Sequence, residues 1–72
     1  MDNTERKAHP STIERCKVNA RGDARILAGL DPWPTGNPPR SGVEGTFGVN
    51  LYVLRRAGLD ALCEELEALA KG

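Results

Sequence analysis

The sequence predicts a small all-α domain of three helices. Apolar residues recur with helical spacing in three segments, and clusters of proline and glycine separate these segments. The three predicted helices span residues 11–28, 42–57 and 60–70. A proline-rich loop at 32–40 connects the first two, and we expect the first helix to pack across a corner formed by the other two. The 72 residues suit a single domain, 11–72, which follows a polar N-terminal arm at 1–10.

The first helix is expected to begin at Ser11, directly after Pro10. Ser11 and Glu14 have the spacing of a capping box, in which each side chain accepts a hydrogen bond from the other residue's backbone N–H. The helix should end at Gly29, the residue type that most often follows a helix C-terminus. Its predicted apolar side consists of Ile13, Cys16, Ala20, Ala24 and Leu27.

The loop at 32–40 contains Trp33 between Pro32 and Pro34. Prolines stiffen this segment and exclude a helix interior. A rigidly held Trp is a good anchor for a protein partner. It can equally fold back over the helices as the largest apolar side chain of a protein with a small core. Both interpretations hold if Trp33 is half-buried at the edge of a contact surface.

The second helix is expected to start with a capping box formed by Ser41 and Glu44. Its apolar side is Val43, Phe47, Leu51 and Leu54, spaced four, four and three residues apart. Gly58 should adopt the left-handed conformation that ends the helix, with Leu59 completing a Schellman motif. Asp60 is then placed to cap the third helix, whose apolar side is Leu62, Leu66 and Leu69.

An α+β fold is the alternative, with residues 46–54 as a strand that pairs between subunits. Apolar residues also alternate along this segment, and Gly45 and Gly48 disfavour a helix by about 1 kcal/mol each. No other segment offers a convincing partner strand, so the helix is preferred.

Composition excludes several classes of function. Ten basic and ten acidic residues give a net charge of zero, so nothing draws the whole chain to nucleic acid or to a membrane. We find no apolar run near 18 residues, no catalytic constellation and no cofactor motif. Cys16 and Cys63 are expected to be free thiols in a cytoplasmic protein. With His9 they lack the spacing of a metal site.

These features predict a small non-enzymatic module that binds another protein. A core this small makes the monomer marginal, so a partner or self-association is expected. The composition would suit a bacterial or phage regulator or inhibitor that occupies a partner surface. The predicted contacts are Pro32, Trp33 and Pro34 in the loop, and Asp60, Glu64, Glu65 and Glu67 on the last helix.

A nucleic-acid-binding accessory protein is the alternative function. The candidate residues are basic and lie on or before the first helix: Arg6, Lys7, Arg15, Lys17, Arg21 and Arg25. The last two helices do not suit a helix-turn-helix motif, because the second of them is acidic where DNA phosphates require the opposite charge. Arg21-Gly22-Asp23 spells the integrin-binding tripeptide, but within a predicted helix we interpret these residues as solvated helix charges.

Overall fold

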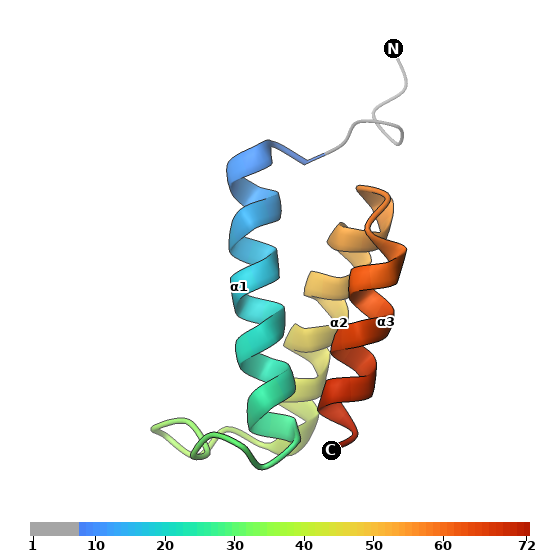
Figure 1. Cartoon of the computed structure of the whole chain (residues 1–72). Coiled ribbons are helices and arrows are strands. Elements are labelled where there is room, and N and C mark those ends of the chain that lie inside the picture. Colours follow the sequence, from blue (N-terminus) through green and yellow to red (C-terminus); the bar gives the residue numbers. More distant parts are fainter. Residues whose placement is uncertain (1–7) are drawn as a thin grey trace.

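The computed structural model describes residues 8–72, which form three packed α-helices (Figure 1). Helix α1 spans Pro10–Leu27, α2 spans Arg40–Arg56 and α3 spans Asp60–Ala70. The all-α prediction is therefore confirmed. Residues 8–72 contain no strand, so the alternative of a strand at 46–54 is wrong. That segment lies inside α2, because Phe47, Leu51 and Leu54 bury one helical side against the other two helices.

The three helices run alongside one another, and consecutive helices point in opposite directions (Figure 1). The α2–α3 connection is a tight hairpin, not the expected corner with α1 packed across it. The predicted Schellman motif is present here, with Gly58 at a φ of 85°. The N–H of Leu59 donates to the carbonyl of Leu54 at 3.0 Å, and the N–H of Gly58 donates to that of Arg55 at 2.9 Å. The same geometry recurs at Gly29, which ends α1. The 28–39 loop and the C-terminus consequently lie at one end of the bundle (Figure 1).

The first predicted capping box is wrong, because α1 begins at Pro10 instead of Ser11. Proline suits the first helical position, where its missing N–H costs nothing and its φ is already helical. His9 therefore becomes the N-cap, and its Nδ1 accepts a hydrogen bond from the N–H of Ser11 at 3.1 Å. Glu14 instead forms an ion pair with Lys17 at 2.8 Å.

The second predicted capping box is also wrong, because α2 begins at Arg40 and Ser41 lies inside the helix. The carbonyl of Pro39 accepts hydrogen bonds from the N–H groups of Gly42 and Val43, so the first turn closes without a side-chain cap. Helix α3 likewise has Leu59 as its N-cap and no side-chain cap hydrogen bond. Asp60 is its first residue and not its cap, but its negative charge still suits the positive end of the helix dipole.

The core combines small side chains from α1 with large ones from α2. Cys16, Ala20 and Ala24 bring the backbone of α1 close to the other helices, and α2 fills the remaining space. The predicted apolar sides are confirmed, with Ile13, Leu27, Leu62 and Leu69 partly buried at the margin. The buried residues are Cys16, Ala20, Ala24, Val43, Phe47, Asn50, Leu51, Leu54, Cys63 and Leu66.

Both cysteines behave as small hydrophobic residues. Cys16 and Cys63 are buried free thiols, and the Sγ of Cys63 donates to the carbonyl of Leu51 at 3.5 Å. Burial raises the pKa of Cys63 and so disfavours the reactive thiolate. No helix within residues 8–72 is both long and apolar enough to cross a lipid bilayer.

Candidate functional site

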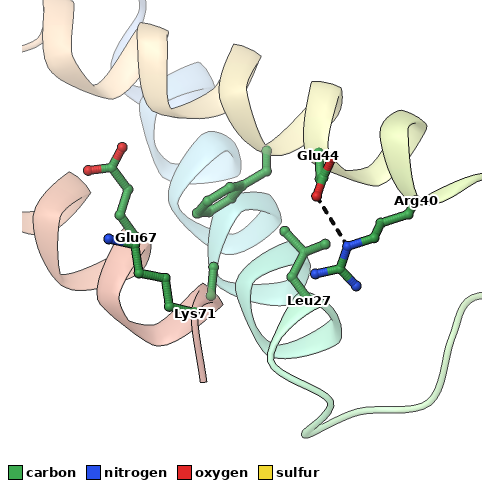
Figure 2. A pocket seen from close by; sticks show the side chains of 7 residues that line it. Leu27, Arg40, Glu44, Glu67 and Lys71 are labelled. Atoms are coloured by element: carbon green, nitrogen blue, oxygen red, sulfur yellow. Dashed lines mark hydrogen bonds and ion pairs between the residues drawn. The ribbon is translucent and has the colours of Figure 1, made fainter.

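A groove of about 500 Å³ opens at the end of the bundle that carries the 28–39 loop and the C-terminus (Figures 1 and 2). Its floor is apolar and is made by one residue from each helix: Leu27 of α1, Phe47 of α2 and Ala70 of α3. Three helix ends meet here, so the floor is assembled from residues far apart in the sequence. The groove therefore offers an apolar surface that a side chain of another molecule can cover.

Charged side chains of both signs form the two walls of the groove (Figure 2). On α2, the Nε of Arg40 lies 3.1 Å from an oxygen of Glu44. At the end of α3, Glu67 and Lys71 form the opposite wall. Lys71 makes no ion pair with residues 8–72. Two cations and two carboxylates give the groove no net charge, which suits a ligand that presents both polar signs around an apolar group.

Glu67 is held in the α3 wall by Arg55 of α2. An Nη atom of Arg55 lies 2.8 Å from a carboxylate oxygen of Glu67, and a second contact reaches Asp60 at 4.0 Å. The hydrogen bond from Arg55 to Glu67 and their charge attraction raise the pKa of the arginine. This pair ties the C-terminal half of α3 to α2 and fixes one side of the groove.

The proline-rich loop holds its shape through its own contacts. The indole N–H of Trp33 donates to the carbonyl of Pro38 at 2.8 Å, and the N–H of Asn37 donates to that of Pro34 at 3.2 Å. Gly36 and Asn37 both have positive φ, which a tight turn requires. Trp33 and Pro34 are half-buried, whereas Pro32 is exposed. The predicted role of these three residues in binding stays a prediction.

The four predicted acidic contacts differ in their surroundings. Asp60 and Glu67 both face Arg55, and Glu64 and Glu65 are exposed without an ion pair in the described part of the chain. Asp60 starts α3 at the end of the bundle opposite the groove, and only Glu67 lines the groove. Of the seven contacts predicted in the loop and on α3, only Glu67 therefore lines the groove.

The predicted basic side of α1 is partly neutralised by intramolecular ion pairs. Lys17 pairs with Glu14, and the Nε of Arg25 lies 2.9 Å from an oxygen of Asp31. Arg15 and Arg21 are exposed and make no ion pair with residues 8–72. Arg6 and Lys7 lie outside the described residues. Of the basic residues predicted on α1, only Arg15 and Arg21 are left unpaired among residues 8–72, which weakens the case for a nucleic-acid surface.

Asp23 is less solvated than the sequence predicts, because one of its two carboxylate oxygens is buried. Its Oδ2 is shielded from solvent and has no hydrogen-bond partner among residues 8–72. Burial raises the pKa of this carboxyl group. The Arg21-Gly22-Asp23 tripeptide lies inside α1, as expected.

Apart from Glu67, which the sequence predicts as a partner contact, the groove residues have another predicted role or none. Leu27 and Phe47 were expected in the core, and Glu44 in a helix cap. Arg40, Ala70 and Lys71 carried no local signal, because only the meeting of the three helices brings them together. No group of three or more His, Cys, Asp or Glu side chains within residues 8–72 is arranged to hold a metal ion.

Comparisons of this chain with protein-family models, with curated proteins and with solved structures find no match.

Proposed function

We propose that this chain is a small non-enzymatic protein-binding module and that its contact surface is the groove end of the bundle. The observation that carries the proposal is the groove itself, with an apolar floor between walls of mixed charge. Protein interfaces commonly combine an apolar centre with a polar rim, and a few anchor residues supply most of the binding energy. The groove offers this combination on a small scale.

The proline-rich loop extends the same surface. It lies at the groove end of the bundle (Figure 1), and Trp33 is already fixed by its hydrogen bond to Pro38. Binding through a preorganised loop costs less conformational entropy than binding through a flexible one. The partner would insert an apolar side chain over Phe47 and place polar groups against Arg40, Glu44, Glu67 and Lys71. The module would then act by occupying that surface of the partner.

A capture experiment with matched variants tests this proposal. Ala70→Arg places a long charged side chain at the groove floor, and Trp33→Ala removes the loop's indole. Asn19→Arg is the control, because Asn19 is exposed on α1 and does not line the groove. Each immobilised protein is incubated with lysate of the source organism, and captured proteins are identified by mass spectrometry.

The proposal expects a protein that the wild type and Asn19→Arg capture equally, and that Ala70→Arg and Trp33→Ala lose. Circular dichroism establishes that all four baits are equally helical. Capture that is unchanged by both Ala70→Arg and Trp33→Ala would contradict the proposal.

A further inference from the structure

The side of α2 opposite the core exposes apolar surface that no other described helix covers. Val49 and Tyr52 are 65% and 61% exposed. Gly45 and Gly48 lie on the same side, and a Cβ added at either glycine would have no neighbour within 4 Å. Arg56 completes this side, with its guanidinium carbon 5.8 Å from the centre of the Tyr52 ring. Arg56 makes no ion pair with residues 8–72.

The corresponding side of α3 carries the opposite charge. Ala61, Glu64 and Ala68 are exposed, and Glu64 and Ala68 lie two residues either side of the buried Leu66, which places them on the opposite side of the helix. Glu64 makes no ion pair in the described part of the chain. The hairpin of α2 and α3 therefore presents an unpaired cation on one helix and an unpaired carboxylate on the other.

We propose that two copies of this chain form a dimer through the outer sides of α2 and α3, with α3 of each copy packed on α2 of the other. The two-fold axis runs along the helices. Four helices then form a closed bundle in which both contacts are identical, as two-fold symmetry requires.

The positions of the residues along the hairpin make this arrangement self-complementary. The short turn places Arg56 and Asp60 at the same end of the bundle, and both helices advance about 1.5 Å per residue. Counting away from the turn, Tyr52 lies level with Glu64, and Gly48 lies level with Ala68. In the dimer Arg56 therefore meets the Asp60 and Glu64 carboxylates of the second copy. Gly48 and Ala68 meet at a closely packed small-residue contact.

Charge excludes the other two-fold arrangement of the same surface. An axis perpendicular to the helices would place α2 on α2 and α3 on α3. Arg56 would then approach the N-terminus of the second α2, where Arg40 and the positive end of the helix dipole repel it. The charge pattern therefore favours the arrangement with α2 against α3.

The small core of the monomer favours a dimer that buries more apolar surface. Among the described residues, Leu54 and Cys63 are the largest side chains that are fully buried. A chain of 72 residues buries a smaller fraction of its surface than a larger domain. Covering Val49 and Tyr52 adds to that buried surface. The parallel axis also places both grooves at the same end of the dimer.

Sedimentation velocity between about 1 µM and 1 mM tests the proposal. An interface that covers few apolar side chains is expected to be weak, so the expected result is a reversible shift towards twice the 7.8 kDa mass within this range. Arg56→Glu and Glu64→Arg should each weaken the dimer at least tenfold, and the double variant should recover most of the loss. Arg15→Glu on α1 is the control and should leave the dimer constant unchanged.

Gly48→Leu separates pairing from folding. The monomer has room for the larger side chain, and leucine favours a helix over glycine, so the thermal midpoint of the dilute protein should rise. The same side chain blocks the close contact with the second copy, so the dimer should be lost. A chain that stays monomeric up to 1 mM would overturn the proposal. So would a dimer that tolerates Arg56→Glu, Glu64→Arg and Gly48→Leu.

Discussion

Replacing Asp23 by alanine should stabilise the protein. The Oδ2 of Asp23 is shielded from solvent and has no hydrogen-bond partner among residues 8–72. A buried polar group without a partner costs about 1–3 kcal/mol, and alanine adds about 0.5 kcal/mol of helix propensity. Some of this gain is offset by lost contacts of the side chain, so we expect a net gain of about 1–2 kcal/mol at pH 7. In a domain of this size that corresponds to a rise in the thermal midpoint of roughly 4–16 °C.

The gain in stability should depend on pH, and the direction of this dependence follows from the raised pKa of Asp23. Burial holds the pKa of Asp23 in the folded protein above its ordinary value of 3.8. The folded state therefore binds this proton more tightly than the unfolded state does. This tighter proton binding stabilises the folded wild type fully below pH 3.8, and the stabilisation is lost as the pH rises through the folded-state pKa. The free-energy difference between Asp23→Ala and wild type should thus be larger at pH 7 than at pH 3.5.

Urea denaturation followed by circular dichroism measures both effects. Asn19→Ala is the matched control, because Asn19 lies on the same helix, is exposed and has a helix propensity close to that of aspartate. Asn19→Ala should gain only the propensity difference, with no dependence on pH in this range. The reasoning is refuted if Asp23→Ala gains no more than Asn19→Ala, or if its gain is the same at pH 3.5 and pH 7.

Three further outcomes follow from the structure. Gly22→Ala should raise the free energy of unfolding by about 1 kcal/mol in a urea titration, because a Cβ there meets nothing within 4 Å and the glycine lies inside α1; no gain would show a hidden steric cost. Trp33→Phe should lose about 0.5–1.5 kcal/mol, because the hydrogen bond to Pro38 disappears while most of the ring remains, and unchanged thermal melting would count against that bond. A fluorescent 20-nucleotide DNA should show no change in anisotropy at 50 mM salt, since only Arg15 and Arg21 are unpaired on the described part of the basic side; binding that Arg21→Glu abolishes would favour the nucleic-acid alternative.

The sequence was sufficient to predict the three helices and how two of them end. Val43, Phe47, Leu51 and Leu54 repeat at helical spacing, and this periodicity reports burial directly. Gly58 adopts the left-handed conformation, which other residues adopt only at a cost, so the residue type alone predicts a helix end here. Helix ends were therefore predicted from strong local preferences.

The helix starts were mispredicted because two local preferences compete there. Ser11 and Ser41 both have the sequence of a capping box, but each is preceded within two residues by a proline. Proline at the first helical position, or at the N-cap, starts the helix earlier and leaves the serine inside it. Priority of proline over serine would move both predicted starts towards the observed ones, Pro10 and Arg40.

The groove could not be predicted from the sequence for a different reason. Its floor needs the ends of α1, α2 and α3 to meet, and no local pattern encodes that meeting. The ion pairs that shape the surface have the same origin. Arg25 reaches Asp31 only after the chain turns at Gly29, and Arg55 reaches Glu67 only across the hairpin. Charge counted along the sequence therefore overestimated how many charges are free to bind a partner.

The alternation of apolar residues at 47–53 has a physical explanation that links fold and surface. In α2 the side chains of Phe47 and Leu51 enter the core, whereas Val49 lies on the opposite side and is 65% exposed. When a helix has an exposed apolar residue between two buried ones, its sequence shows the same alternation as a half-buried strand. The strand-like pattern therefore results from a helix with apolar residues on two sides. One side is covered by α1 and α3, and in the dimer proposed above α3 of a second copy covers the other.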